Sequence, residues 1–338
     1  MGIFAIAVWD QQEKHLVLAR DRMGEKPLYF GWCGDSFVFG SELKALRRYP
    51  GFSNAISRDA LAAYFRYSYV PAPYSIYEGI YKLEPGCMMT VSRSAASKSP
   101  GTIPQAPGSG EGWEIRPYWK LHDHVISGQS SLIDDEQDGL DALETALRES
   151  IQLQSIADVP LGAFLSGGVD SSLIVALMQS QSNRPVKTFT IGFDEQGYNE
   201  AEFAKAVAEH LHTEHTELYL SANQTMDVIP GLPAIYDEPF ADSSQIPTFL
   251  VAQMARQHVT VALSGDAGDE LFGGYNRYFW GPRIWKKASL LSYGMRQKLS
   301  ALLISSSAAQ GTHQQALVRF WPGKFQNALL KEKLQKLG

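Results

Sequence analysis

The seven residues Ser166 to Ser172 have the composition of a phosphate-binding turn. They read Ser-Gly-Gly-Val-Asp-Ser-Ser, which combines two glycines, three serine hydroxyls and one carboxylate. Glycines let backbone N–H groups approach an anion, and serine hydroxyls donate to phosphate oxygens. Asp170 can hold a magnesium ion against the same phosphates. The pattern therefore predicts a phosphate site with bound magnesium.

The flanking residues predict the elements that must position this turn. The apolar run Pro160 to Leu165 precedes it as a strand, and a helix-like run from Leu173 follows it. A glycine-rich strand-to-helix turn capped by serines is the purely structural alternative. No lysine follows the glycines, so this is not the loop that ends in Gly-Lys-Ser/Thr. It resembles instead the pyrophosphate-binding loop of ATP pyrophosphatases, which cleave ATP between the α and β phosphates.

A second turn of the same kind follows the apolar strand pattern of residues 259–263. It reads Ser-Gly-Asp-Ala-Gly-Asp-Glu from Ser264 to Glu270. Because ligands bind beyond the carboxyl ends of strands in open parallel sheets, both turns are predicted to line one crevice. Asp266, Asp269 and Glu270 repel one another unless a cation compensates, and magnesium would do so. The alternative is that Asp269 and Glu270 only begin a helix and complement its dipole.

Length and composition limit the function classes. The chain has 338 residues, of which 44% are hydrophobic, so about two domains with sizeable cores are expected. Its formal net charge of −6 provides no field that would gather nucleic acid or an anionic membrane. No apolar run approaches the roughly 20 residues that span a bilayer, and no secretory signal is recognisable. We therefore expect a cytoplasmic protein without nucleic-acid or membrane partners, and buried or idle thiols at Cys33 and Cys87.

The amino-terminal part is predicted to be an antiparallel meander, with strands at residues 3–9, 15–19, 27–32 and 36–40. The first strand is apolar on both faces, which is typical of a sheet covered on both sides. Because such a strand at the first residues is unusual, we expect upstream sequence to be missing. Residues 93–112 are poor in large apolar side chains and are predicted to form a flexible surface loop.

From about residue 135, strand and helix patterns alternate, which predicts a doubly wound parallel α/β sheet. Residues 277–338 have the pattern of polar-faced helices. The strands are predicted at 160–165, 186–191, 215–219 and 259–263, and the helices from 171, at 200–212 and at 246–257.

The two glycine-rich turns, together with Thr188–Phe193 and Asp237–Ser244, resemble the motifs of glutamine-hydrolysing asparagine synthetases. In that family, ATP activates the side-chain carboxylate of aspartate as an aspartyl-adenylate, and ammonia then displaces AMP. The resemblance implies that residues 1–125 are the later part of a type 2 glutamine amidotransferase domain, an antiparallel N-terminal nucleophile-type fold. It implies that residues 135–338 are an ATP-pyrophosphatase (synthetase) domain, incomplete at its carboxyl end.

The resemblance also implies roles for individual residues. Asp266 lies where the family has an acidic residue important for forming the adenylate, and some relatives have glutamate there. ATP and Mg²⁺ are the implied substrate and metal, and Asp170 and Asp269 would hold the metal. The implied ATP-binding residues are Phe164, Leu165, Ser166, Gly167, Gly168, Asp170, Ser171, Ser172, Ile191, Ser264 and Gly265.

Asp237, Glu238, Asp242 and Ser243 would orient the aspartate substrate, a role implied by the family alone. By itself this segment is an acidic turn that caps a helix. Three histidines, His210, His212 and His215, lack a common metal-ligand spacing and are expected to be solvated.

Parts of the family pattern are not found in this sequence. The family's glutaminase begins with a cysteine whose α-amino group acts as base, whereas residue 2 here is glycine, so we expect no glutaminase activity. The family's adenylation lysine is not placed either. The expected reading is an asparagine synthetase truncated at both ends, acting on ATP, aspartate and glutamine or ammonia. Two alternatives for the function stay open: a related amidotransferase or β-lactam-forming synthetase, and a non-catalytic nucleotide-binding remnant. For the assembly, a homodimer and a complex with chains that supply the missing segments stay open.

Overall fold

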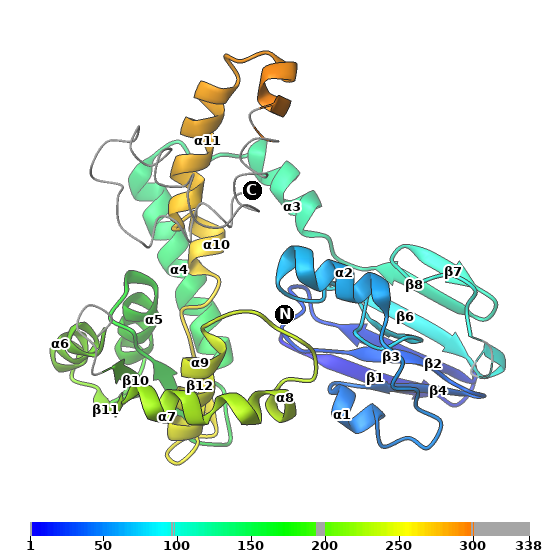
Figure 1. Ribbon diagram of the computed structural model, residues 1–338. Coiled ribbons are helices and arrows are strands. Elements are labelled where there is room, and N and C mark those ends of the chain that lie inside the picture. Colours follow the sequence, from blue (N-terminus) through cyan, green and yellow to red (C-terminus); the bar gives the residue numbers. More distant parts are fainter. Residues whose placement is uncertain (1, 96, 98, 194–199, 299, 301–338) are drawn as a thin grey trace. The chain divides into compact units, whose positions relative to one another are not determined.

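Short strands separated by polar turns form two antiparallel sheets in the amino-terminal part of the protein (Figure 1). The computed structural model describes residues 2–95, 97, 99–193, 200–298 and 300. One sheet has the order β1-β2-β6-β8-β7 and the other the order β4-β3-β5. The strands are β1 (Ala5–Asp10), β2 (His15–Arg20), β3 (Tyr29–Cys33), β4 (Ser36–Gly40), β5 (Ile80–Lys82), β6 (Cys87–Ser92), β7 (Gly108–Gly110) and β8 (Trp113–Pro117).

The two sheets share an apolar core. Leu18 from β2, Phe30 from β3 and Met89 from β6 are buried in one cluster, so the sheets pack face to face. The other face of β3 is covered by helices, because Leu43 and Ala60 pack there. The helices of this part are α1 (Leu43–Leu46), α2 (Arg58–Tyr67), the 3₁₀ helix η1 (Arg93–Ala95) and α3 (Leu121–Gln129).

Three expectations for this part are corrected. The four predicted strands exist, but they are not one meander, because β2 pairs with β6 and β3 pairs with β4 and β5. Strand β1 is an edge strand that is mostly exposed, with Trp9 at 46%, so it is not covered on both faces within the described chain. The segment 93–112 contains η1 and β7, and Ala95 is 1% exposed and accepts a hydrogen bond from Trp32 Nε1. Ala95 therefore packs into the core, although most of the described residues of the segment are exposed, as expected.

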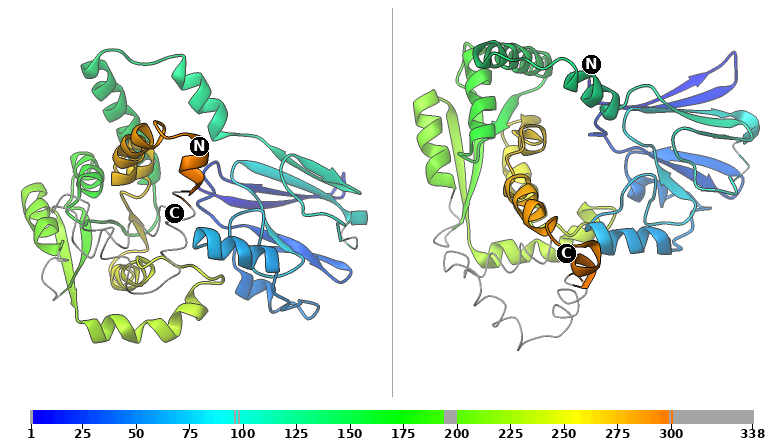
Figure 2. Two further views of the ribbon diagram at one scale, coloured as in Figure 1. Left: turned by 45° about the horizontal axis from the view of Figure 1, so that its top comes forward. Right: turned by 90° about the horizontal axis from the view of Figure 1, so that it is seen from above.

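A four-stranded parallel sheet follows in the chain, with the order β11-β10-β9-β12. In the views of Figure 2, its green strands form a group distinct from the blue and cyan antiparallel strands. Its elements are α4 (Glu136–Gln154), β9 (Leu161–Phe164), α5 (Val169–Ser180), β10 (Lys187–Phe193), α6 (Ala201–Leu211), β11 (Glu214–Leu220), α7 (Ala222–Asp227), the 3₁₀ helix η2 (Ile229–Gly231), α8 (Leu232–Ile235), α9 (Gln245–Ala255) and β12 (Val261–Leu263).

Helices cover both faces of the parallel sheet. Ala163 on β9 packs with Val175 of α5 and Ala204 of α6 on one face. Phe189 on β10 packs with Met254 of α9 on the other face (Figure 1). The predicted fold class, antiparallel sheets with helices followed by a doubly wound parallel sheet, is therefore confirmed.

By compactness, the chain divides into the units Met1–Ser264 and Gly265–Gly338. All strands of the described residues lie in the first unit, and the described part of the second contains α10 (Gly268–Phe272) and α11 (Asn276–Ala288). Helix α11 agrees with the helical pattern expected from residue 277, and the expectation for residues 301–338 lies outside the described part. None of the helices in the described ranges has the length and apolar character that a bilayer crossing needs.

Asp21 fixes the turn where the chain leaves one antiparallel sheet for the other. Its side chain is 1% exposed and accepts hydrogen bonds from the N–H groups of Glu25 and Lys26, each at 3.0 Å. Burial by itself would raise the pKa of Asp21, but these hydrogen bonds outweigh it and hold the pKa below its usual value. The carboxylate therefore stabilises the folded state when it is charged.

We predict that Asp21→Asn lowers the free energy of unfolding by about 2 kcal/mol at pH 7, because a charged acceptor is replaced by a neutral one. Since the pKa of Asp21 is lower in the folded state, this contribution is present above the ordinary aspartate pKa of about 4 and is lost as the pH falls below it. Urea denaturation at pH 7 and pH 3 measures the difference. The exposed Asp35→Asn serves as control, and an equal loss at both pH values for Asp21→Asn would contradict the assignment.

Candidate functional site

The pairing of β12 with β9 brings the starts of the two glycine-rich turns to one edge of the sheet. The strands run parallel, with Val261 opposite Leu161 and Leu263 opposite Ala163. The sheet grows from β9 through β10 to β11 on one side, and then the chain returns to place β12 on the other side. The switch in strand order therefore lies between β9 and β12, and the carboxyl end of such a pair is where open α/β sheets bind ligands.

Two serines fix the backbone of the turn after β9. The Ser171 hydroxyl accepts a hydrogen bond from the Ser166 N–H at 3.1 Å, and the two hydroxyls lie 2.9 Å apart. The Gly168 N–H donates to the Ser166 hydroxyl at 3.3 Å. These bonds cross from the first to the last part of the turn, so its shape is set before any ligand binds.

Gly167 is required by both conformation and space. Its φ of +77° lies in the left-handed region that side chains other than glycine avoid. A Cβ atom at this position would lie 2.6 Å from the Ala204 nitrogen and 2.7 Å from the Phe203 Cβ of α6. The turn therefore packs directly on the first part of α6.

The start of α5 fits a phosphate group. Gly168 caps the helix without a side-chain hydrogen bond, so the first-turn N–H groups point out of the helix at its positive end. The Ser172 hydroxyl is buried and has no hydrogen-bond partner among the described residues. A buried hydroxyl without a partner is costly, and a phosphate oxygen would satisfy it. Asp170 lies in the same helical turn, where its carboxylate suits magnesium bound partly by phosphates.

The other predicted nucleotide-binding residues of the first unit lie at or near the carboxyl ends of strands. Phe164 ends β9 and contacts the core on the α9 face, whereas Leu165 is buried in the opposite core. Leu165 therefore offers a ligand only its backbone, whose N–H donates to Phe189 O at 2.9 Å. Ile191 is half-buried in β10, and Ser264 directly follows β12.

Gly265, Asp266 and Asp269 belong to the second unit, Gly265–Gly338. Gly274 has no room for a side chain, because a Cβ there would fall on Oδ1 of Asp269. The Asp269 carboxylate therefore lies against the turn that ends α10. Ala267 has a φ of +72°, an unusual conformation for a residue other than glycine and one that often accompanies functional loops.

Glu270 is engaged differently from Asp269. Its carboxylate accepts a hydrogen bond from the Tyr275 hydroxyl at 2.6 Å. This bond lowers the pKa of Glu270 and raises the pKa of Tyr275 to about 12. The Glu270 carboxylate is thus bonded to the neutral Tyr275 hydroxyl. Asp269 remains the predicted metal ligand of this segment.

The residues predicted to orient aspartate separate into two groups. Asp242 and Ser243 are exposed and directly precede α9, and Asp242 accepts a hydrogen bond from the Ser244 N–H at 2.8 Å. Asp237 and Glu238 contact the amino-terminal part of the protein instead, through Lys44 of α1 and Lys82 of β5. Sequence reasoning missed these lysines, because no local pattern links them to a segment that lies so much later in the chain.

His215 is the exception among the three histidines. His210 and His212 are exposed, as expected, but His215 is half-buried, with Nδ1 2.8 Å from the Thr188 hydroxyl. Burial lowers its pKa, and it is not solvated as the sequence suggested. In the described ranges, no group of three or more His, Cys, Asp or Glu side chains is arranged to hold a metal ion.

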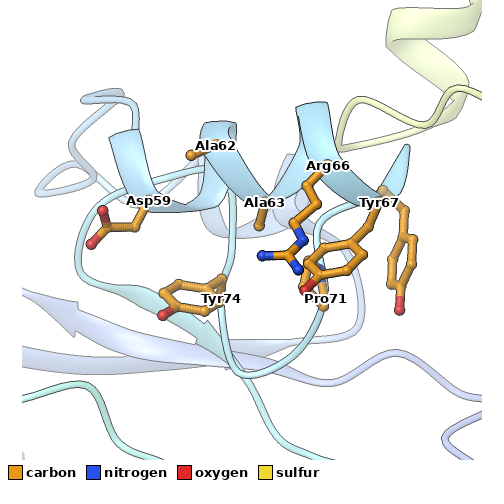
Figure 3. A pocket seen from close by; sticks show the side chains of 8 residues that line it. Asp59, Ala62, Ala63, Arg66, Tyr67, Pro71 and Tyr74 are labelled. Carbon is orange, nitrogen blue, oxygen red and sulfur yellow. The ribbon is translucent and has the colours of Figure 1, made fainter. Parts of the chain in front are cut away.

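A separate pocket of about 480 Å³ lies beside α2 in the amino-terminal part (Figure 3). Asp59 and Arg66 line it from α2, and Pro71 and Tyr74 line it from the loop that follows. None of the predicted site residues lines this pocket, so it is not the nucleotide site proposed from the sequence.

Comparison with known proteins agrees with the geometry: the chain belongs to the asparagine synthase family. The family model described as "Asparagine synthase" matches residues 142–337, more than half of the chain. The model described as "Glutamine amidotransferase domain" matches residues 1–100. The resemblance inferred from the two glycine-rich turns is thereby confirmed.

Curated relatives are similar over most of this chain. The protein named "Putative asparagine synthetase (glutamine-hydrolyzing) 2" of Methanocaldococcus jannaschii is 35% identical over 289 residues, covering 84% of this chain and 51% of that protein. "Asparagine synthetase (glutamine-hydrolyzing) 1" of Bacillus subtilis is 34% identical over 278 residues, covering 82% and 40%. The chain thus matches about half or less of the length of these relatives.

A solved structure of an NH3-dependent NAD synthetase from Campylobacter jejuni has a TM-score of 0.30 at 14% identity, covering 58% of this chain and 93% of that one. At that score, the likeness supports no argument about this chain.

We predict that Gly167→Ala disrupts the phosphate-binding turn. The added methyl group is disfavoured at a φ of +77° and meets α6, so we expect a loss of at least about 1 kcal/mol in the free energy of unfolding and weaker ATP binding. Gly101→Ala is the matched control, because a Cβ there meets nothing within 4 Å. Denaturant titration and ATP titration measure both effects, and equal behaviour of the two variants would refute the close packing.

Ser172→Ala should separate stability from binding. Removing a buried hydroxyl that has no partner should leave the free energy of unfolding unchanged or raise it, whereas losing a hydrogen bond to a charged phosphate should weaken ATP binding roughly tenfold. Ser171→Ala, which removes a bonded hydroxyl, should destabilise the turn. A Ser172→Ala variant that is less stable but binds ATP normally would contradict the proposed contact.

Proposed function

We propose that this chain carries the aspartate-activating function of a glutamine-hydrolysing asparagine synthetase. An oxygen of the aspartate side-chain carboxylate would attack the α phosphorus of ATP, and the bond to the β phosphate would break with release of pyrophosphate. Ammonia would then attack the acyl carbon of the aspartyl-adenylate, and AMP would leave with the electron pair. The observation that carries this proposal is the phosphate-fitting turn at the β9–β12 switch point, in a chain of the asparagine synthase family.

The turn after β9 would bind the ATP phosphates. Ser166 and Ser171 fix its shape, and the α5 N-terminus with the Ser172 hydroxyl would donate to phosphate oxygens. The backbone at Gly167 and Gly168 would lie against the phosphates. Fixed donors of this kind stabilise the charge that moves onto departing pyrophosphate, because they need no reorganisation during the reaction.

The adenosine would lie along the carboxyl ends of the strands. We propose that Phe164, Leu165 and Ile191 line its site and that Ser264 and Gly265 close it. Phe164 ends β9, Leu165 follows it, Ile191 lies in the second half of β10 and Ser264 follows β12, which supports the proposal. The side chain of Leu165 contributes through packing rather than contact.

Asp170 and Asp269 would hold Mg²⁺, which when bound supplies positive charge against the phosphates. The first-turn position of Asp170 supports its role, as does the fixed carboxylate of Asp269 beside Gly274. Magnesium sites commonly use one or two carboxylates together with substrate phosphates, so a cage of protein ligands is not needed. Asp266 would act in forming the adenylate.

Asp242 and Ser243 are proposed to orient the aspartate substrate. Both are exposed and lie before α9, which packs on β10 next to β9. Asp237 and Glu238, earlier in the same segment, would contribute to orienting the substrate. The ammonia of the complete enzyme would come from glutamine, in keeping with the amidotransferase match over residues 1–100.

Neither described cysteine is suited to attack glutamine. Cys33 and Cys87 are both buried and unpaired. Burial raises the pKa of the Cys33 thiol and raises the pKa of Cys87 to about 11, so neither is a thiolate at neutral pH. We therefore propose that these two thiols are structural.

We also propose that residues 1–125 form an amidotransferase-type domain and that residues 135–338 form a synthetase-type domain. The protein is proposed to act in the cytoplasm.

The test is pyrophosphate release by the purified 338-residue chain from ATP and Mg²⁺, with aspartate and ammonia each present or absent. We expect release that requires aspartate and falls at least about a hundredfold in Asp170→Ala, because a metal-binding carboxylate stabilises charge in the transition state. Asp138→Ala is the matched control, since Asp138 is an exposed carboxylate in the first turn of another helix, α4. ATP binding without aspartate-dependent release would instead favour a non-catalytic nucleotide-binding module.

A further inference from the structure

A short segment between α8 and α9 is fixed to the helices and strands of the amino-terminal part by hydrogen bonds and ion pairs. We call residues 235–241 the strap. Its Ala241 N–H donates to Ser68 O at 2.8 Å, and Lys44 contacts both Ile235 O and the Asp237 carboxylate at 3.3 Å. All of these contacts lie within the unit Met1–Ser264.

Glu238 makes the most extensive of the strap contacts. Its Oε1 accepts a hydrogen bond from the Ile76 N–H at 2.7 Å. Its Oε2 forms an ion pair with Lys82 and accepts from the Tyr29 hydroxyl at 3.4 Å. Both carboxylate oxygens are therefore engaged by the amino-terminal strands and the loop beside them.

These charges are largely removed from water. The side chains of Glu238 and Lys82 are 10% and 14% exposed, and that of Asp237 is 13% exposed. Burial lowers the pKa of Lys82 and raises the pKa of Tyr29, so the tyrosine is a neutral donor to Glu238. A buried pair of this kind resists separation, because removing one partner leaves the other charge buried and unpaired.

Lys82 also connects the strap to the loop after α2. Its ammonium donates to Val70 O at 2.5 Å, and the neighbouring Ser68 O is the acceptor for Ala241. Tyr69 and Pro71 of this loop line the pocket of Figure 3. The strap, Lys82 and this loop thus form one connected set of contacts.

We propose that Glu238 is a positioning residue: its ion pair with Lys82 holds the strap on the amino-terminal strands and so places Asp242 and Ser243, which follow the strap, at the acceptor site. Glu238 does not bind the acceptor itself, because both of its oxygens are already engaged. The link to aspartate rests on the proposed function, whereas the anchoring of the strap does not.

Lys82→Met tests the anchor, with Glu238→Gln as a second variant that keeps the side-chain size and the acceptor for Ile76. Hydrogen–deuterium exchange of the peptide containing residues 235–241 is the first measurement. We expect exchange at least roughly tenfold faster in both variants and unchanged in β9. Lys187→Met is the control, because Lys187 forms an exposed ion pair with Glu214 at 3.8 Å. Exchange in the strap that matches the unsubstituted chain would overturn the proposal.

Kinetics then test the consequence for the substrate. Each variant should raise the KM for aspartate in pyrophosphate release by roughly tenfold or more and keep the ATP affinity within about twofold. The double variant should raise the KM by less than the product of the two single effects, because both substitutions break the same ion pair. Loss of aspartate dependence in Glu238→Gln with normal behaviour in Lys82→Met would mean that Glu238 binds the substrate directly, which would overturn the proposal. Absence of aspartate-dependent release in the unsubstituted chain would reject the proposed function alone, since the exchange measurement does not depend on it.

Discussion

The parallel pairing of β12 with β9 is the constraint on which the candidate site depends. The two strands are far apart in sequence, and their register places Leu263 opposite Ala163. Consequently, the turn that begins at Leu165 and the residue Ser264 leave the sheet at the same edge. The helices on both faces make this pairing stable, because β9 contributes Ala163 to one core and Phe164 to the other. A one-residue change in register would exchange these side chains between the two cores.

The turn after β9, which we propose binds phosphate, illustrates how local chemistry and packing agree. Gly167 supplies a left-handed backbone and close contact with α6, and the hydroxyls of Ser166 and Ser171 bond each other. Of the three serines, only Ser172 has a buried hydroxyl with no hydrogen-bond partner in the described chain, and it lies at the helix terminus where an anion would be stabilised. Composition alone does not show that Ser166 and Ser171 fix the turn while the Ser172 hydroxyl is left without a partner in the described chain.

The sequence predicted the local elements well and the long-range contacts poorly. Strands such as Lys187–Phe193 and the helix that starts after Gly168 follow from apolar runs and periodicity, which are local signals. The pairing of β2 with β6, and the contact of Ala95 with Trp32, depend on tertiary contacts of small or distant residues. The predicted meander was therefore wrong, and the predicted surface loop missed η1, β7 and the buried Ala95. The exposed edge strand β1 was also missed, because an apolar strand gives no local sign of which faces are covered.

Glu238 shows the same limit within the candidate site. The family resemblance predicts a substrate role for the acidic segment Asp237–Ser244, but the sequence does not show which of its carboxylates is paired with Lys82. The structure shows that Glu238 is largely buried and that both of its oxygens are engaged. This is the basis for proposing that Glu238 positions the segment rather than contacting the substrate.

The proposed function depends most on the turn after β9 binding the ATP phosphates and the metal. Affinity cleavage tests this, with Fe²⁺ in place of Mg²⁺ and ATP bound, followed by mass spectrometry of the cut backbone. We expect ATP-dependent cuts near residues 166–170. No cuts in this turn, or cuts there that do not depend on ATP, would show that it is not the nucleotide site.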